Sequence, residues 1–216
     1  MGGHTTNNKT LAQSKDGSLY VTGFRPTSNI GLNSEAWLAK YNNIGDLLWE
    51  TSFRMPEGYF FSYKSAWIAV DSAGSAYMIV NGEFSSNRPW LVKYDSQGKR
   101  QWQMPIAAAS GKPTVDSISI NSAGNVYATG FVNVANVQDP VYGAFTNGWV
   151  ASYNGATGSQ LWTQEFVAPE GDGRGYFNDV VADSYGNVYT AGQIAAVNPS
   201  RPNLPRNTDN WLVKLN

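Results

Sequence analysis

Cysteine is absent from these 216 residues, and histidine occurs once, as His4. Without thiols the chain can form no disulfide, no thiolate nucleophile and no cysteine zinc site. One histidine in the terminal segment also argues against a Ser-His-Asp triad and against a zinc ion held by several histidines. We therefore expect no metal site, no cofactor and no catalytic residue of these kinds.

Long hydrophobic runs and an excess of one charge are lacking too. No stretch of about 18 apolar residues could cross a bilayer, and the first residues lack the apolar core of a signal peptide. Charged residues make up 14% of the chain, the formal net charge is -1, and no run of Lys or Arg occurs. This balance gives no electrostatic reason to expect nucleic acid. The sequence predicts neither a nucleic-acid partner nor membrane insertion.

Aromatic residues and glycine are abundant, with 8 Trp, 12 Tyr and 22 Gly. β-branched and aromatic residues beside many Gly, Asn and Ser are typical of short strands joined by tight turns. Apolar residues show no helical period anywhere in the chain. The composition predicts an all-β protein.

One order of markers recurs four times along the chain. A turn with Asp or Asn and Gly precedes a Tyr, and a Trp followed by alternating apolar residues comes next. The Tyr residues at 20, 77, 127 and 189 lie 57, 50 and 62 residues apart, somewhat above the ~40–50 residues of propeller repeats. We define repeats 1 to 4 as about 11–53, 66–104, 117–166 and 179–216, within a single domain over 1–216.

Each repeat predicts a meander of four antiparallel strands, and a meander repeated radially is a propeller blade. Repeats 1 to 3 end with a strand that carries Trp49, Trp102 or Trp162, but repeat 4 has no such strand. The predicted fold is a β-propeller with four blade repeats of four-stranded antiparallel sheets, the last of which lacks its outer strand.

The stretches Asp183-Ser-Tyr-Gly-Asn-Val-Tyr-Thr-Ala-Gly192 and Trp90-Leu-Val-Lys-Tyr-Asp95 resemble the bacterial seven-bladed β-propeller repeat family. The resemblance covers nearly the whole chain. It implies a bacterial protein at the cell surface or outside the cell, with the secretion signal not present in this chain. It implies no activity, because the family shares no catalytic motif, and fold by itself does not indicate function.

Three assemblies agree with four repeats. The chain can be a fragment of a ring of about seven or eight blades, half of a two-chain ring of about eight blades, or a self-closed ring of four, all within the usual range of propellers. An open blade edge can pair with another strand. A homo-oligomer formed through this open edge is therefore one expectation.

The connections predicted to be long lie on one side of the blades, and loops on a rigid scaffold often carry function. They span 24–35, 53–65, 83–89, 104–116, 131–147, 166–178 and 193–209. Aromatic rings beside Arg suit the binding of a protein or a carbohydrate, although such rings also anchor their own loops. The predicted ligand-binding residues are Tyr59, Phe61, Tyr63, Arg88, Tyr142, Arg174, Tyr176 and Arg201.

The residues that recur in every repeat have structural interpretations. Repeated Trp and Tyr residues are expected to pack between neighbouring blades. Lys40, Lys93 and Lys214 are expected to be solvated or to extend along the surface. The recurring Asp of each turn offers a single carboxylate, so Asp71 and Asp183 favour turn formation over calcium binding.

We therefore expect a non-catalytic surface or secreted module that binds a protein or a glycan. One alternative is a structural or self-assembling propeller unit completed by another chain. Another is an enzyme acting on polysaccharide, which would need two carboxylates at a defined separation. The acidic residues available for such a pair are Glu57, Glu83, Asp116, Glu170, Asp172 and Asp179.

Overall fold

The computed structural model describes residues 10–26, 34–54, 65–81, 88–139, 143–167, 173–196 and 207–215. Every regular element within these ranges is a β-strand, which confirms the all-β prediction. Within the same ranges, no helix is long and apolar enough to cross a membrane.

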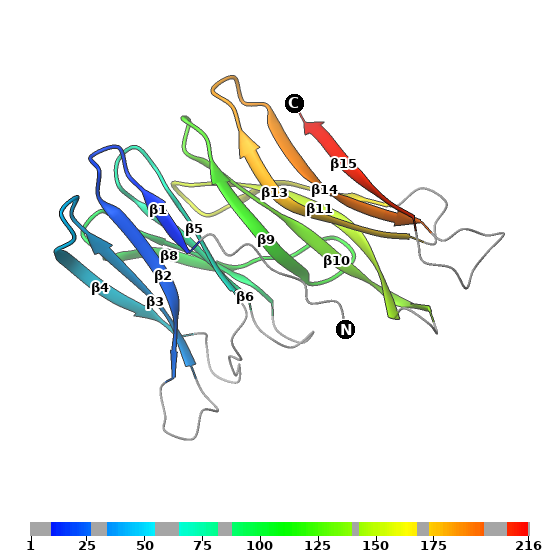
Figure 1. The fold of residues 1–216 in the computed structure, drawn as a ribbon, viewed down its shortest axis with the longest axis horizontal. Coiled ribbons are helices and arrows are strands. Elements are labelled where there is room, and N and C mark those ends of the chain that lie inside the picture. Colours follow the sequence, from blue (N-terminus) through cyan, green and yellow to red (C-terminus); the bar gives the residue numbers. More distant parts are fainter. Residues whose placement is uncertain are drawn as a thin grey trace. The chain divides into compact units, whose positions relative to one another are not determined.

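Repeats 1 and 2 each form a four-stranded antiparallel sheet with the strands in sequence order (Figure 1). The first contains β1 (Leu11–Gln13), β2 (Leu19–Pro26), β3 (Ser34–Tyr41) and β4 (Leu47–Phe53). The second contains β5 (Ser65–Val70), β6 (Ala76–Asn81), β7 (Trp90–Tyr94) and β8 (Arg100–Pro105). Both confirm the predicted meander.

Repeats 3 and 4 share one seven-stranded sheet of order β15-β14-β13-β11-β10-β9, with β12 paired to β11. Its strands are β9 (Pro113–Ile120), β10 (Asn125–Asp139), β11 (Gly143–Asn154), β12 (Gln160–Phe166), β13 (Gly173–Ala182), β14 (Val188–Ala196) and β15 (Asn207–Leu215). The two repeats are linked by a single parallel pair, Thr146 with Arg174. Apart from this link, the sheet is an antiparallel group of four strands and one of three.

The chain groups into two compact units. Unit 1 contains Met1–Ile106 together with Gly155–Gly158, and unit 2 contains Ala107–Asn154 together with Ser159–Asn216. Repeats 1 and 2 therefore belong to unit 1, and repeats 3 and 4 belong to unit 2 apart from that short turn. The expectation of one domain over 1–216 stays a prediction.

The hairpin turns form as the sequence predicts. Asp71 Oδ1 accepts hydrogen bonds from the backbone N–H of Ala73 at 3.0 Å and of Ser75 at 2.8 Å. Gly74 follows with a φ of 80°, a conformation that favours glycine. Asp95, Asn121 and Asp183 accept the same pair of bonds in their own turns.

The two sides of each sheet have different neighbours. We call the side that carries Tyr20, Tyr77, Tyr127 or Tyr189 the tyrosine face, and the other side the reverse face. Each of these Tyr residues pairs with the next strand at Lys40, Lys93, Ser152 or Lys214. The Lys ammonium lies over the Tyr ring at 5.2, 5.1 and 5.7 Å in repeats 1, 2 and 4.

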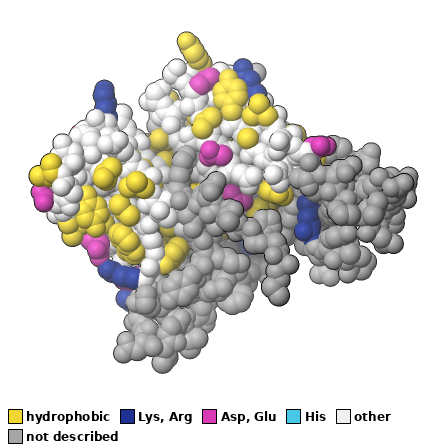
Figure 2. Space-filling model, viewed as in Figure 1, with side chains coloured by type: hydrophobic (Ala, Val, Ile, Leu, Met, Phe, Trp, Pro, Cys, Tyr) yellow, Lys and Arg dark blue, Asp and Glu magenta, His cyan; other side chains and the backbone are white. Residues whose placement is uncertain are grey.

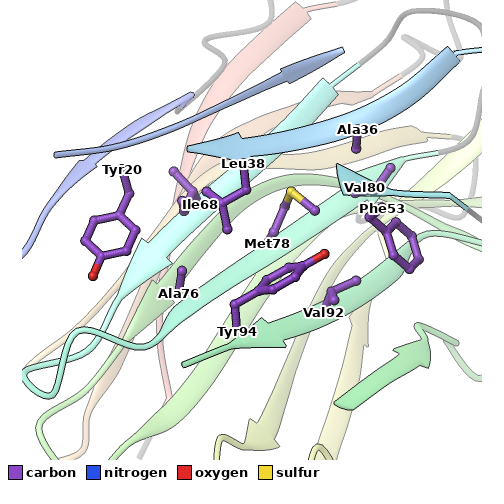
Figure 3. Close-up of a cluster of buried hydrophobic side chains, with 10 residues drawn as sticks. All are labelled: Tyr20, Ala36, Leu38, Phe53, Ile68, Ala76, Met78, Val80, Val92 and Tyr94. Atoms are coloured by element: carbon purple, nitrogen blue, oxygen red, sulfur yellow. The ribbon is translucent and has the colours of Figure 1, made fainter. Parts of the chain in front are cut away.

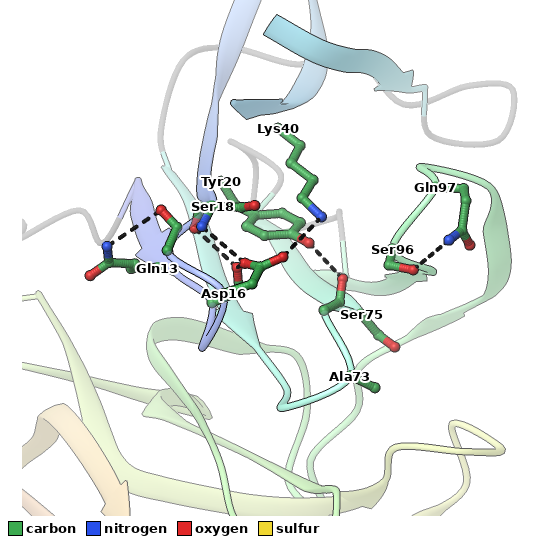
Figure 4. Close-up of polar contacts among 12 residues, drawn as sticks. Gln13, Asp16, Ser18, Tyr20, Lys40, Ala73, Ser75, Ser96 and Gln97 are labelled. Carbon is green, nitrogen blue, oxygen red and sulfur yellow. Dashed lines mark hydrogen bonds and ion pairs between the residues drawn. The ribbon is translucent and has the colours of Figure 1, made fainter. Parts of the chain in front are cut away.

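The prediction that these lysines are solvated or extend along the surface is wrong for Lys40, which is only 7% exposed. Its ammonium lies over the Tyr20 ring and 4.0 Å from Asp16 Oδ2 (Figure 4). A cation over an aromatic face and near a carboxylate loses less on burial than an isolated one. Lys93 is half-buried and donates to Gly155 O at 2.8 Å.

In unit 1 the tyrosine face of repeat 1 packs on the reverse face of repeat 2. The buried cluster between them contains Tyr20, Ala36, Leu38, Phe53, Ile68, Ala76, Met78, Val80, Val92 and Tyr94 (Figure 3). Trp49 Nε1 donates to Ser96 O at 3.0 Å, and its ring covers Gly98. Trp49 therefore packs between neighbouring sheets, as predicted.

In unit 2 the tyrosine face of repeat 3 meets the reverse face of repeat 4 through a smaller apolar cluster. This cluster contains Tyr127, Val180 and Val188. Beside it, the hydroxyls of Thr129 and Thr190 lie 3.0 Å apart, and both residues are fully buried.

The prediction of long loops on one side needs correction, because several of these segments continue the strands. β10 and β11 pair as far as Asp139 with Gly143. β13 begins at Gly173, within the segment predicted as a loop over 166–178. Arg174 and Tyr176 are therefore strand residues, held by backbone hydrogen bonds of the sheet.

Candidate binding surface

Three of the eight predicted ligand-binding residues lie in the described part of the chain. Arg88 is exposed and precedes β7 in unit 1, whereas Arg174 and Tyr176 lie together on β13 in unit 2. The other five lie outside the described residues: Tyr59, Phe61, Tyr63, Tyr142 and Arg201.

Tyr176 belongs to a polar row across three strands. The register places Tyr176 opposite Gln193 on β14, and Gln193 opposite Asn210 on β15. The Tyr176 hydroxyl donates to Gln193 Oε1. Partial burial raises the pKa of Tyr176, so its hydroxyl stays protonated and able to donate. Asn210 is exposed at the end of this row.

Arg174 lies two residues before Tyr176 and is half-buried. Its Nε is buried, and no acceptor for it is found among the described residues. A buried donor without a partner is costly, and the guanidinium group has five donors in a fixed fork. Arg174 can therefore bind an acceptor supplied from outside the described residues.

Phe177 has a different role on the opposite side of β13. Its ring lies 5.4 Å from that of Phe166 and 5.1 Å from that of Trp211. A Cβ added at Gly148 would approach the Phe177 ring to 2.7 Å, so this glycine provides the space for the ring. Phe177 is fully buried and anchors its own segment, while Tyr176 lies on the tyrosine face.

Below the polar row, the tyrosine face of repeat 4 carries exposed apolar side chains, and no described sheet packs on it. Leu212 is 72% exposed and Val181 is 51% exposed. They belong to a shallow open pocket lined by Asp179, Val180, Val181, Tyr189, Ala191 and Leu212. Lys214 borders this area with its ammonium over the Tyr189 ring.

Sequence reasoning missed Leu212 as a surface residue. The equivalent positions in repeats 1, 2 and 3 are Leu38, Leu91 and Val150, and all three are fully buried. The repeat pattern therefore predicts a core residue at 212. Among the described residues, hydrophobic side chains appear at several places on the surface drawn in Figure 2, which displays one face of the molecule.

In the part of the chain that the structure describes, the features that bear on catalysis are acidic side chains. Within the described ranges, no group of three or more His, Asp or Glu residues is arranged to hold a metal ion. Burial raises the pKa of Asp116 on β9 to about 7. Asp179 accepts a hydrogen bond from Ser117 Oγ at 2.6 Å. The other acidic candidates lie outside the described residues: Glu57, Glu83, Glu170 and Asp172.

No protein-family model and no curated protein matches this sequence. The chain is similar to the Dos1 propeller, with a TM-score of 0.51 and 18% identity over 90% of this chain and 45% of that one. It is also similar to ulvan lyase, a polysaccharide lyase of family PL25, with a TM-score of 0.59 and 12% identity over 99% of this chain and 59% of that one.

This chain thus spans about half the length of these solved structures, 45% of one and 59% of the other. Identities this low carry information about the fold and none about activity. The neighbours are β-propeller proteins, and the described sheets are antiparallel four-stranded meanders of the kind that build them. The fold of this chain is accordingly of the β-propeller type.

Proposed function

We propose that this chain is a non-catalytic binding module, built of four propeller blades, that binds a protein through the tyrosine face of repeat 4. One observation carries the proposal: Leu212 is 72% exposed where the equivalent Leu38 is fully buried. Exposed apolar surface rimmed by polar groups marks interaction sites. The resemblance to a bacterial surface repeat adds the expectation that the module works outside the cell.

The composition of the surface favours a protein over a glycan. Val181, Ala191 and Leu212 form an apolar centre, bordered by the polar row of Tyr176 and by Lys214. Protein interfaces combine an apolar centre with a polar rim in this way. Sugar recognition depends on open aromatic rings, but the Tyr189 ring is partly covered by the Lys214 ammonium.

Two arrays test this proposal, one of purified extracellular proteins that includes this chain itself and one of glycans. We expect binding on the protein array that Leu212→Asp weakens at least about tenfold, as for a central interface residue. The control is Tyr185→Asp, because Tyr185 is 91% exposed in a hairpin turn. Two blank arrays with folded protein, binding only to glycans, or equal effects of the two variants, would contradict the proposal.

A polysaccharide-acting enzyme is a second candidate, supported by Asp116. Burial raises the pKa of this carboxyl to about 7, which suits a general base near neutral pH. The test is turnover of acidic polysaccharides, ulvan included, by the wild-type protein and by Asp116→Asn. Turnover that the variant abolishes would favour the enzyme over the binding module.

A further inference from the structure

We infer that the tyrosine face of repeat 4 binds the reverse face of repeat 1 in a second copy of this chain, so that copies associate head to tail. The inference rests on the proposed docking surface and names its partner. It is built from the contact between neighbouring sheets that the chain already makes inside each unit.

Inside unit 1, a tyrosine face is covered by the reverse face of another repeat. The Tyr20 hydroxyl donates to Gly74 O at 2.7 Å, and Thr22 Oγ1 donates to Met78 Sδ at 3.1 Å. In unit 2 the equivalent pair, Thr129 and Thr190, also meets, with hydroxyls 3.0 Å apart. Two independent interfaces thus use the same register.

On the tyrosine face of repeat 4, the equivalent positions have no neighbouring sheet packed on them among the described residues. Tyr189, Ala191 and Leu212 occupy the places of Tyr20, Thr22 and Leu38. Among the described residues, the Tyr189 hydroxyl donates to Asp183 Oδ2 alone, at 3.4 Å, which is long for an O–H donor. This hydroxyl is therefore available to a better acceptor.

The matching reverse face is found on repeat 1. Its positions correspond one by one to those of repeat 2 that cover Tyr20 and Leu38, where Ile68, Ala76, Met78, Val92 and Tyr94 are buried. On repeat 1, Leu11 is 55% exposed, and Leu19, Val21 and Tyr41 are partly exposed. Ala39, at the place of Val92, is fully buried. Four of these five positions are thus core in repeat 2 and at least partly exposed in repeat 1.

The register of the two known interfaces predicts the contacts of the new one. Gly17 holds the place of Gly74, so by analogy with Tyr20 in unit 1 alone the Tyr189 hydroxyl would donate to Gly17 O of the second copy. Ala191 would lie against Val21, and Leu212 near Leu11. In the new contact, Ala191 and Val21 would replace the Thr–Met pair of unit 1 and the Thr–Thr pair of unit 2. Because neither Ala nor Val has a hydroxyl, the contact would bury no hydroxyl without a partner.

The two surfaces also become polar at the same end, unlike the interface inside unit 1. On repeat 1, Glu35 accepts from Arg25 Nε at 2.7 Å and from Arg54 Nε at 2.8 Å. On repeat 4 the corresponding end carries the row of Tyr176 and Gln193. In repeat 1 the tyrosine face has Phe24 and Ala36 there, packed in or against the apolar cluster. Both surfaces of the proposed contact are therefore polar at this end, where the interface inside unit 1 is apolar. This agreement in polarity favours a contact between the two surfaces.

Such a contact joins two different surfaces, so it generates a closed ring of copies or an open filament. Cysteine crosslinking tests it cleanly, because the chain has no cysteine of its own. The side-chain atoms at the two known equivalents of the Val21–Ala191 pair lie 3.0 and 3.1 Å apart. These atoms lie beyond the Cβ atoms, so the distances show that the two positions face each other directly across the interface, the arrangement that a disulfide requires.

The experiment mixes two single variants, Val21→Cys and Ala191→Cys, under mild oxidation. We expect a disulfide-linked dimer that contains one of each and forms at least about tenfold faster than with the control mixture. The control pairs Ala191→Cys with Tyr185→Cys, a thiol at a position 91% exposed in the parent chain. Equal rates in the two mixtures would overturn the inference.

Two further measurements separate the remaining outcomes. The double variant Val21→Cys/Ala191→Cys should give linked multimers; an exclusively intrachain disulfide would overturn the inference. Light scattering of the wild-type chain should show a mass that rises with concentration, and Leu212→Ser should weaken association at least about tenfold. A strict monomer that still binds another protein through Leu212 would refute the second copy as partner and leave the proposed function intact.

Discussion

Unit 1 contains the interface between repeats 1 and 2, and unit 2 contains the interface between repeats 3 and 4. Equivalent positions face each other in both interfaces, but the side chains at these positions differ in polarity. In unit 1, Met78 fills a buried apolar cluster and accepts a hydrogen bond from Thr22. In unit 2 the equivalent Thr190 faces Thr129 and also donates to the backbone oxygen of Asp179. The same stack of sheets therefore accommodates an apolar cluster in unit 1 and two buried hydroxyls in contact in unit 2.

The backbones of the two units differ at the strands that begin the repeats. β9 and β13 each contain an extra residue, Asp116 and Asn178, opposite a regular stretch of the next strand. Such a β-bulge brings two backbones close together, and glycine is favoured there. Gly130 and Gly192 occupy this place in unit 2, whereas repeat 2, which pairs without a register shift, has Val80.

The largest effect is expected at these glycines. A Cβ at Gly192 would lie 1.9 Å from Tyr176 O, a backbone atom that cannot move aside. Gly192→Ala should lower the free energy of unfolding by about 3 kcal/mol or more. In unit 1, Gly23→Ala would meet the Trp37 side chain at 2.9 Å, which can shift, so about 1 kcal/mol is expected. Equal losses in urea unfolding would contradict the bulge interpretation.

The second-largest effect compares the apolar cluster of unit 1 with the hydroxyl pair of unit 2. Met78→Ala leaves a cavity in the apolar cluster of unit 1 and should cost about 3 kcal/mol. Thr190→Val keeps its volume in unit 2 and removes hydroxyl contacts, for which about 1 kcal/mol is expected. Both are measured by chemical denaturation. A larger loss for Thr190→Val would mean that the hydroxyl pair, not apolar burial, dominates.

The bulge of β9 also predicts a pH dependence. Folding raises the pKa of the Asp116 carboxyl from 3.8 to about 7. Between these two pH values the folded chain keeps a proton on Asp116 that the unfolded chain has released. Wild-type stability should therefore fall as the pH rises from about 4 to about 7. Asn178 fills the same bulge position in repeat 4, which makes Asp116→Asn a natural replacement.

Asp116→Asn should be more stable than the wild type by about 2 kcal/mol at pH 8, roughly half of what the full shift implies, because the side chain is only partly buried. At pH 4 the two proteins should differ little. The measurement is the unfolding midpoint as a function of pH. Parallel curves for the two proteins would show that Asp116 is not the titrating group.

The smallest effect compares covered and uncovered tyrosines. Tyr20→Phe removes a hydrogen bond to Gly74 O inside unit 1 and should cost about 1 kcal/mol. Tyr189→Phe removes only the long contact to Asp183, so a change within about 0.5 kcal/mol is expected for a dilute monomer. Thermal unfolding at low concentration measures both. A similar loss at Tyr189 would indicate that its hydroxyl is already engaged.

Much of the fold was accessible from the sequence because its signals are local. The turn at Asp71 depends on bonds to residues two and four positions ahead, and glycine follows at a positive φ. The Tyr and Lys that face each other across strands follow from alternation within one repeat. These relations predicted the four-stranded meanders of repeats 1 and 2 correctly.

The candidate site was only partly accessible. Arg174 and Tyr176 were predicted to be loop residues, but they lie on β13. The prediction failed because the sequence contains no signal for how far a strand extends beyond the short core of its repeat. The burial of Lys40 was missed because it depends on the neighbouring ring of Tyr20. Glycine stands at this place in repeats 1, 3 and 4, as Gly23, Gly130 and Gly192. The residue alone therefore did not identify the bulge at Asp116, which required the register.

By itself the sequence determined the repeat, the turns and the side of each strand that is apolar, since each of these depends on residues close together in the chain. The tertiary structure alone decided which apolar sides are covered. Leu38 and Leu212 are the same residue at the same repeat position, yet one is fully buried and the other is 72% exposed. Burial depends on what lies across the interface, and only for Leu38 do the described residues include a neighbouring sheet there.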